Sequence, residues 1–352
     1  MLRLLLWISG ALLAPALFGN PKTIYKNYQS CQTCHISQSG GGLLSPYGKG
    51  MAEAFMATWA QDGQTSSLLD EWDKMDLSVN YLHAYVDSRS DGFSYQDDFP
   101  MVLEADLAIH LDDRLSYIVS AGYYGDKKTP EFRTHYLNYR YSKNIQFRAG
   151  SYFAPFGLSI EDHTSFIRRE LSFDQGMETW NLELSYSSKL AQVFFTYSFG
   201  EDASIIGSDE GRLRSESPGE EARLIHLVFY PMKYMRLGVS HRQQKARAST
   251  SVFMSYSPYK NSYLLAQLSR DKKEQQRHLS YLQFGYYILS GLDLYTQYGH
   301  FFNEKDTLFE KVAIGLDWMP TPGLGLKLET SQSLKDGVAN TKTFLAALRF
   351  WL

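Results

Sequence analysis

The chain has 352 residues, a formal net charge of −3, 44% hydrophobic side chains and 15% aromatic side chains. The small net charge argues against a nucleic-acid partner, and a mean hydropathy of −0.32 argues against helical membrane spans, each of which needs about 20 mostly apolar residues. The 25 Tyr and 21 Phe are instead typical of strands that present aromatic rings to a membrane interface.

Residues 1–19 have the pattern of a secretory signal peptide. A basic start at Arg3 precedes an apolar run over residues 4–13, and small residues at Ala14 and Ala16 suit a cleavage site. The alternative, a retained anchor helix, needs an apolar run of roughly 17–25 residues, which is longer than this one. The sequence therefore predicts export to the periplasm.

Cys31 and Cys34 are the only cysteines, and together with His35 they form the segment Cys-Gln-Thr-Cys-His. In a C-x-x-C-H segment the two thiols add to the haem vinyl groups and the imidazole becomes the proximal iron ligand. A disulfide and half of a zinc site are the alternatives, but no second Cys or His pair for zinc follows within about forty residues. We therefore expect one covalent c-type haem on Cys31 and Cys34, with His35 as its proximal ligand.

Residues 20–75 are predicted to form a small haem domain with a helix over residues 49–60. This segment is too short for a free-standing hydrophobic core, so the haem or the barrel wall must supply buried surface. A thioether as the sixth iron ligand would raise the redox potential and a second imidazole would lower it. The candidates for that position are Met51 and Met56 on the helix, and His83 or His110.

Residues 76–352 consist of about sixteen runs of about ten residues with period-two alternation, separated by alternately short and long connections. The short connections are expected near residues 112–113, 142–144, 187–189, 231–233, 258–261, 290–291 and 320–323. The longer ones are expected near residues 87–97, 125–131, 155–176, 200–221, 271–276, 303–307 and 335–340. Outer-membrane barrels have short periplasmic turns and long external loops. The predicted fold class is therefore all-β, a transmembrane antiparallel β-barrel of about 16 strands behind a small α-helical and coil monohaem domain, with a soluble β-sandwich as the alternative.

Alternation within the strands predicts which side chains face lipid. In the last strand these are Phe344, Ala346, Leu348, Phe350 and Leu352, opposite Arg349. In an early strand they are Met101, Leu103, Ala105, Leu107 and Ile109, opposite Glu104, Asp106 and His110. Charge therefore collects on the inner side, as a wet lumen requires.

Residues 149–158 read Ala-Gly-Ser-Tyr-Phe-Ala-Pro-Phe-Gly-Leu, and residues 166–171 read Phe-Ile-Arg-Arg-Glu-Leu. These segments resemble the G-x-x-x-x-P-F-G segment and trailing F-x-x-R of phosphate-selective-type porins. The resemblance implies a long third loop that folds into the pore and places His163, Arg168, Arg169 and Glu170 at its constriction. The alternative is an external loop with solvated charges. Phosphate selectivity is not implied, because the lumen strands show no evident ladder of arginines.

The order of signal peptide, single C-x-x-C-H motif, small domain and porin resembles the fused monohaem cytochrome–porins. Those proteins pass electrons across the outer membrane of iron-oxidising bacteria. The resemblance covers this architecture and the motif at residues 31–35, and it does not extend to residues inside the barrel.

A haem iron offers one-electron chemistry, and a barrel opens a path through a layer about 30 Å thick. Together they predict a redox conduit of the bacterial outer membrane, an electron-transfer protein rather than a classical enzyme, with its haem at the periplasmic mouth or in the lumen. The expected partners are outer-membrane lipid, a periplasmic cytochrome, a small redox solute or metal ion, and two further copies in a homotrimer. The alternatives are a diffusion porin with a structural haem, a barrel that assembles with separate multihaem cytochromes, and a haem peroxidase or sensor.

Overall fold

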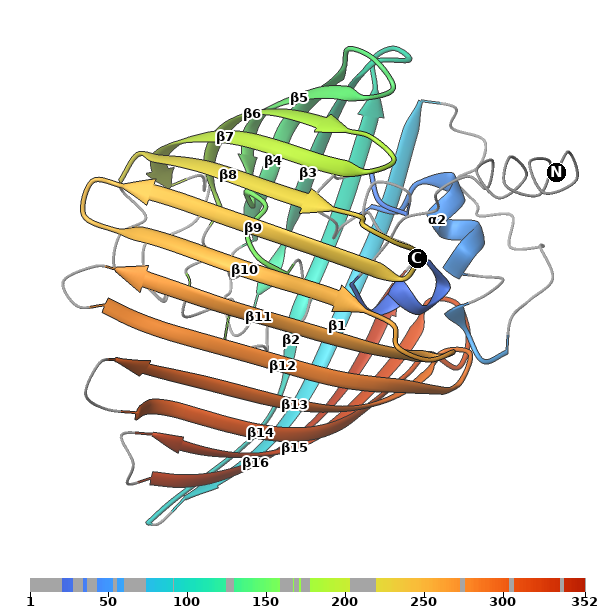
Figure 1. Ribbon diagram of the computed structural model, residues 1–352. Coiled ribbons are helices and arrows are strands. Elements are labelled where there is room, and N and C mark those ends of the chain that lie inside the picture. The colour runs from blue at the N-terminus through green and yellow to red at the C-terminus, as the bar shows by residue number, and fades with distance from the viewer. Residues whose placement is uncertain are drawn as a thin grey trace, which may run out of the picture.

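The computed structural model describes residues 21–27, 34–36, 43–52, 56–59, 74–90, 92–124, 130–158, 167, 171, 178–202, 220–272, 276–303, 307–335 and 339–351. Within them, sixteen antiparallel strands close into one barrel, each paired with its neighbours in the chain, and β1 pairs with β16 (Figure 1). The strands are β1 (Met75–Ser90), β2 (Phe93–His110), β3 (Leu115–Tyr124), β4 (Glu131–Arg140), β5 (Ile145–Tyr152), β6 (Thr179–Ser187), β7 (Ala191–Asp202), β8 (Ala222–Phe229), β9 (Met235–Gln244), β10 (Ala248–Tyr256), β11 (Ser262–Lys272), β12 (Gln276–Leu289), β13 (Leu292–Asn303), β14 (Thr307–Trp318), β15 (Leu324–Lys335) and β16 (Ala339–Trp351). The predicted fold class and strand number are confirmed. No helix in this described part is long and apolar enough to cross a membrane.

The connections alternate between the two ends of the barrel largely as the sequence predicts, with two differences. Strand β1 continues to Ser90 and strand β2 begins at Phe93, so most of the loop expected over residues 87–97 is strand instead. A turn at residues 245–247, closed by the Gln244 amide donating to the Arg247 carbonyl at 2.7 Å, was not predicted at all. At both places polar residues lie on both faces of the hairpin, so no hydrophobic alternation marks where the strand ends.

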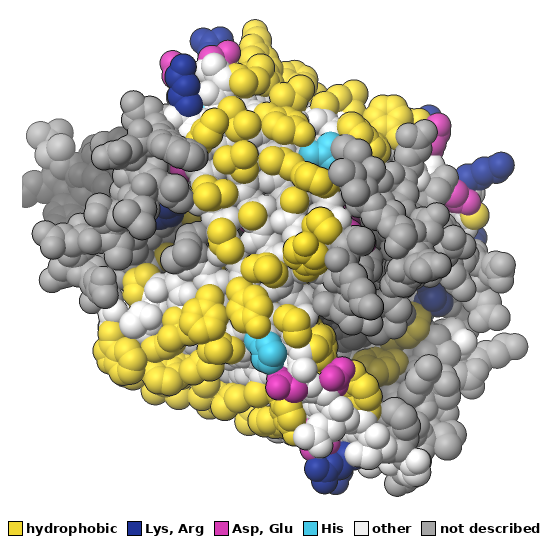
Figure 2. Space-filling model, turned by 180° about the vertical axis from the view of Figure 1, so that it is seen from behind, with side chains coloured by type: hydrophobic (Ala, Val, Ile, Leu, Met, Phe, Trp, Pro, Cys, Tyr) yellow, Lys and Arg dark blue, Asp and Glu magenta, His cyan; other side chains and the backbone are white. Residues whose placement is uncertain are grey.

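The two faces of the barrel wall differ as predicted. Large exposed apolar side chains such as Leu103, Val312, Leu328 and Phe350 cover the outside. Figure 2 shows hydrophobic side chains, in yellow, spread over the face of the molecule that it presents. Their neighbours along the strands point inward, and among these the side chain of Asp106 is buried. An apolar outer band with polar side chains inside is the pattern of a barrel that sits in a membrane.

Met101 is an exception to the predicted alternation. In the pairing of β1 with β2, Leu82 lies opposite Val102 and His83 lies opposite Pro100, which leaves Met101 as an extra residue in β2. Such a bulge interrupts the regular alternation of side chains. Met101 consequently lines a cavity inside the barrel, and its predicted contact with lipid is wrong.

The N-terminal part contains the short helices η1 (Pro21–Lys26) and α2 (Pro46–Met51). The sequence predicted a helix at residues 49–60, and α2 begins earlier because Ser45 caps it: its hydroxyl accepts a hydrogen bond from the Gly48 amide at 3.1 Å, and Pro46 follows in the first turn. In Figure 1 both α2 and the C-terminus lie at the same end of the barrel, the end with the short turns.

Candidate functional site

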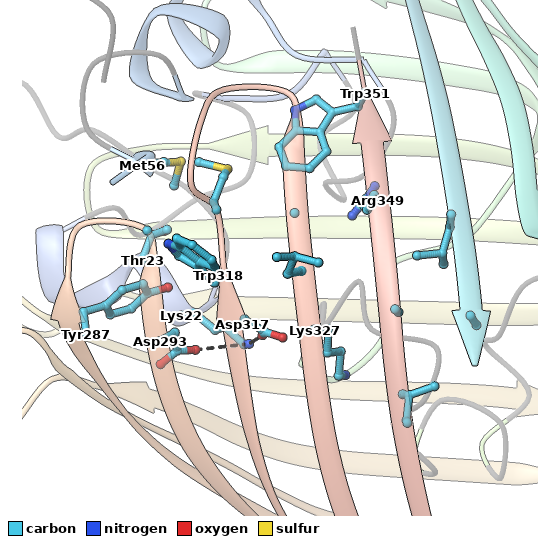
Figure 3. A pocket seen from close by; sticks show the side chains of 18 of the residues that line it. Lys22, Thr23, Met56, Tyr287, Asp293, Asp317, Trp318, Lys327, Arg349 and Trp351 are labelled. Carbon is cyan, nitrogen blue, oxygen red and sulfur yellow. Dashed lines mark hydrogen bonds and ion pairs between the residues drawn. The ribbon is translucent and has the colours of Figure 1, made fainter. Parts of the chain in front are cut away.

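Lys22 of η1 fastens the N-terminal segment to the inner wall of the barrel. Its Nζ lies 2.5 Å from Oδ2 of Asp317 and 3.3 Å from Oδ2 of Asp293, on β14 and β13 (Figure 3). Burial alone lowers the Lys22 pKa, but Asp317, Tyr263, Asp293 and Tyr287 raise it, and the resulting pKa lies well above its ordinary value. The ammonium is therefore a permanent cation between two carboxylates.

The remainder of η1 packs on aromatic and apolar side chains of the wall. The ring of Tyr25 stacks on that of Tyr287 with 4.3 Å between centroids. Ile24 is 1% exposed and belongs to a buried cluster formed mainly by lumen-facing residues of β8 to β13. The helix thus lies inside the barrel.

A second attachment is made by residues 56–59. The Thr58 amide donates to the Met319 carbonyl at 2.9 Å, and its hydroxyl donates to the Ser290 carbonyl at 2.8 Å. The indole of Trp318 donates to the same hydroxyl at 3.0 Å, and Trp59 meets that indole edge-on at 5.6 Å. These bonds join the segment to the β12–β13 and β14–β15 turns.

A third attachment is made by Leu43, which lies between the first two in the sequence but packs on a different part of the barrel wall. Leu43 is buried among Ala108, Ile118, Tyr136 and Tyr152, which belong to strands β2 to β5. The barrel wall thereby supplies the buried surface that the small N-terminal segment lacks, as the sequence analysis required. We call the described residues of this segment, 21–27, 34–36, 43–52 and 56–59, the plug.

The second half of the predicted haem motif lies within the plug. Cys34 is buried, and its carbonyl accepts a hydrogen bond from the Ser45 amide at 2.9 Å, while His35 forms a β-bridge with Leu44. A Cβ on Gly48 would lie 2.0 Å from the Cys34 carbonyl oxygen, so α2 stacks directly on the motif and only glycine fits there. Cys31 lies outside the described residues.

Two polar side chains of the inner wall bear on whether a haem fits here. Arg236 is 3% exposed, and its Nε and Nη1 have no hydrogen-bond partner among the described residues. The same holds for the hydroxyl of Ser255, its register partner on β10. A buried guanidinium without an acceptor is costly unless an anionic group pairs with it. Arg236 follows Tyr234 by two residues in the chain. The Tyr234 amide donates to Asn27 Oδ1 at 3.1 Å, and Asn27 precedes Cys31 by four residues. A haem held by Cys34 and His35 would carry carboxylate side arms, and Arg236 is a buried cation of the same inner wall.

The candidate sixth ligands fall into two groups. Met51 is buried in α2 and Met56 lines the cavity beside η1, while His110 bonds to Asp76 Oδ2 at 2.8 Å, so these three lie on the lumen side. His83 lies between two strand residues that line the lumen cavity, so it points outward, where its Nε2 lies 2.5 Å from Asp98 Oδ1. This position removes His83 from the candidates.

The loop between β5 and β6 enters the lumen, as the porin resemblance implies. The amide of Gly157 donates to Ser240 Oγ at 2.9 Å, and that of Leu158 donates to Gln267 Oε1 at 2.8 Å, on β9 and β11 across the barrel. Gly157 has a φ of 62°, and a Cβ there would lie 2.5 Å from the Gln267 side-chain nitrogen. This contact gives a physical reason for the glycine in the P-F-G segment.

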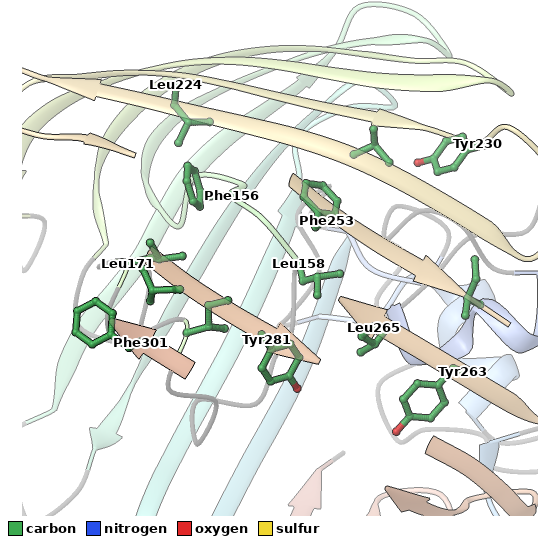
Figure 4. Packing of buried hydrophobic residues seen from close by; sticks show 14 residues of the cluster. Phe156, Leu158, Leu171, Leu224, Tyr230, Phe253, Tyr263, Leu265, Tyr281 and Phe301 are labelled. Atoms are coloured by element: carbon green, nitrogen blue, oxygen red, sulfur yellow. The ribbon is translucent and has the colours of Figure 1, made fainter. Parts of the chain in front are cut away.

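The same loop contributes Ile167 and Leu171 to the buried cluster that contains Ile24 of the plug. Figure 4 shows Phe156, Leu158 and Leu171 from the loop among side chains of the surrounding strands. The lumen therefore holds a continuous apolar core. The four predicted constriction residues, His163, Arg168, Arg169 and Glu170, lie outside the described residues.

A buried ion pair in the wall was not found by sequence reasoning. Arg148 Nη2 lies 2.7 Å from Glu183 Oε1, with both side chains 1% exposed, and Thr196 donates to the other carboxylate oxygen at 2.9 Å. The guanidinium also lies 4.2 Å above the ring of Tyr152, which packs on Leu43 of the plug. Alternation places these residues in the lumen, but it carries no signal for their pairing.

No protein-family model and no curated protein matches the sequence. Among solved structures, OprB of Pseudomonas putida superposes with a TM-score of 0.64 at 9% identity, covering 85% of this chain and 99% of that one. An anion-selective porin from Comamonas acidovorans gives 0.59 at 10% identity, over 79% of this chain and 99% of that one. OmpT of Vibrio cholerae in its trimer form gives 0.57 at 11% identity, over 80% and 100%.

The fold is that of an outer-membrane porin. These likenesses concern the barrel and show its fold. The short turns, the plug and the C-terminus share one end of the barrel, and outer-membrane barrels turn the end with short turns toward the periplasm.

Proposed function

We propose that this porin-like barrel is a redox conduit in which a c-type haem on Cys31, Cys34 and His35 links the periplasmic end of the barrel to an external electron donor or acceptor. The observation that carries the proposal is the plug: the segment with the motif is packed inside the barrel mouth at three places. A c-type haem supplies reversible one-electron chemistry.

In this proposal, residues of the chain hold the haem in place and restrict the passage of ions. The plug fixes Cys34 and His35 at the lumen wall, and the buried Arg236 provides a cation for a haem carboxylate. The loop residues and Ile24 place a cluster of apolar side chains in the lumen beside β8 to β13, and this cluster narrows the path for water and hydrated ions. An electron needs no aqueous path, so such a lumen favours electrons over ions.

The partners follow from the two ends of the barrel. A periplasmic cytochrome would dock at the plugged mouth, and a small redox solute or a metal ion would approach from outside. The activity is electron transfer, with oxidation or reduction of an extracellular metal as the net reaction, rather than classical enzyme catalysis.

A homotrimer belongs to the same proposal. OmpT, one of the similar structures, was solved as a trimer. On the outer face of β1 and β2, His83 pairs with Asp98 at 2.5 Å and with the Tyr81 hydroxyl at 3.1 Å. Polar side chains of this kind are unfavourable against lipid, whereas a neighbouring subunit would cover them with polar groups.

The second candidate function is a diffusion porin in which the haem is a structural element or absent. The fold itself favours it, because the similar structures include an anion-selective porin. The two candidates differ in what crosses the barrel, electrons or solutes, and in whether His35 is needed.

Haem attachment is tested first. Changing Cys31 and Cys34 together to Ala is expected to abolish haem-stained protein on a denaturing gel, because both thioether bonds are lost. The barrel should still form, since its strands contain neither cysteine, and it should keep its heat-modifiable mobility. Covalent haem retained in the double variant would contradict the assignment.

Electron transfer is tested in liposomes that enclose one redox dye and face another outside. The wild type is expected to exchange electrons between the dyes, and His35→Ala is expected to lose that exchange because the iron loses its proximal ligand. His241→Ala is the matched control, since His241 is exposed at the far end of the barrel and bonds only to Thr250 among the described residues. Equal exchange in wild type and His35→Ala, with ready solute leakage, would reject the conduit and leave the diffusion porin.

A further inference from the structure

A cavity of about 350 Å³ lies inside the barrel between the plug and the inner wall formed by β12 to β16 and β1. Figure 3 shows Lys22, Thr23 and Met56 of the plug on one side of it, and Arg349 and Trp351 of the last strand on the other. The volume falls in the range of about 300–1,000 Å³ that is usual for small-molecule sites. Cys34 and His35, the described residues of the haem motif, are not among its lining residues.

The lining is dominated by flat aromatic and flexible apolar side chains. Tyr25 and Tyr287 form one stacked wall, with 26° between their ring planes, and Trp318 and Trp351 add two indoles. Met56, Met101, Leu82, Leu326 and Leu345 complete the apolar surface. Aromatic faces of this kind bind planar ring systems by offset or edge-to-face stacking.

Two cations that line the cavity, Lys22 and Arg349, differ in whether a carboxylate pairs with them. Lys22 is already neutralised by Asp293 and Asp317. Arg349, by contrast, donates its Nε–H to Asn80 Oδ1 at 2.9 Å and lies 5.5 Å from the Trp351 ring. Among the described residues no carboxylate lies within ion-pair distance of it, and Asp106 interacts with it only at longer range. Its side chain is exposed, so a solute can reach it. An accessible guanidinium beside aromatic walls is a ready partner for an organic anion.

We propose that this cavity binds one planar aromatic molecule that carries a single acidic group. The ring system lies among Tyr25, Tyr287, Trp318 and Trp351, and the anion pairs with Arg349. The bound molecule contacts both plug and wall, so its binding stabilises the docked plug as any ligand stabilises the state that binds it. This site goes beyond the proposed conduit, because no described residue of the haem motif lines it; Met56 is the one lining residue that is also a candidate haem ligand.

The test uses the purified full-length protein in detergent and anthraquinone-2-sulfonate as the probe. Equilibrium dialysis should give one bound probe per barrel. Arg349→Gln should weaken binding by about tenfold or more, the loss expected for a charge-assisted hydrogen bond. Ala347→Trp, which fills the cavity from its own wall, should abolish binding. Arg270→Gln is the matched control, because Arg270 is also exposed and bonds to a single amide side chain, that of Gln276.

An uncharged probe, 2-(hydroxymethyl)anthraquinone, separates the cavity from the charge: Ala347→Trp should abolish its binding, and Arg349→Gln should leave it unchanged. Heat-modifiable mobility verifies that each variant folds. Binding of the sulfonate that is equal in wild type, Arg349→Gln and Ala347→Trp would show partition into the micelle and overturn the proposal. The variant that lacks both cysteines should bind the sulfonate normally, so failure of the conduit and failure of this site are distinguishable.

Discussion

Lys22→Met is expected to open the periplasmic mouth of the barrel and raise its ion conductance severalfold. The substitution removes the cation that joins the plug to Asp317 and Asp293 and leaves two carboxylates facing each other in a low-dielectric site. The Asp317 side chain is 33% exposed and that of Asp293 is 3% exposed, so the loss is smaller than the cost of about 3–5 kcal/mol for a fully buried pair, and it weakens the attachment of η1 to the wall. Single-channel recording in planar bilayers measures the change.

Lys143→Met is the control for this experiment, because Lys143 is an exposed lysine in a short turn at the same end of the barrel. The pH dependence gives a second check. A raised pKa means that the contribution of Lys22 is complete below the ordinary lysine pKa and is lost only as pH rises through the higher pKa of the folded protein. The wild type should therefore stay closed from pH 7 to about pH 10. Opening of the wild type within that interval, or equal conductance of Lys22→Met and Lys143→Met, would contradict the role of Lys22.

Arg148→Met is expected to destabilise the barrel by about 3–5 kcal/mol, because it leaves the Glu183 carboxylate buried with the Thr196 hydroxyl as its one remaining partner in the described part of the chain. Urea unfolding in lipid vesicles, followed by tryptophan fluorescence, measures the difference. Adding Glu183→Leu to the same chain should recover much of the loss, since a buried pair replaced by apolar side chains is often neutral.

Arg89→Met is the matched control, because the Arg89–Asp87 pair has a similar distance of 2.6 Å but an exposed guanidinium. Water screens such a pair, and little change is expected. If Arg148→Met and Arg89→Met had equal effects, the buried pair would make no special contribution to stability.

The sequence alone determined the barrel, its strand number and the side of the wall to which most residues point. These features depend on period-two alternation, which each strand carries locally; Phe350 and Arg349 could be assigned to opposite faces without knowledge of any partner. The C-x-x-C-H motif was equally readable, because its chemistry requires neighbouring residues. Prediction was wrong where the alternation of apolar and polar residues is interrupted. This happens at the bulge that turns Met101 inward and at the polar hairpin tips near residues 90 and 246.

Only the tertiary structure decided what fills the lumen. Lys22 meets Asp293 and Asp317, which are 271 and 295 residues away in the chain, and Gly157 meets Ser240 across the barrel. Alternation states that a residue faces inward, but barrel closure decides which inward residues lie opposite one another and how far a loop or an N-terminal segment reaches among them. The plug, the apolar core around Ile24 and the cavity beside Arg349 arise from such long-range contacts, which no local pattern encodes.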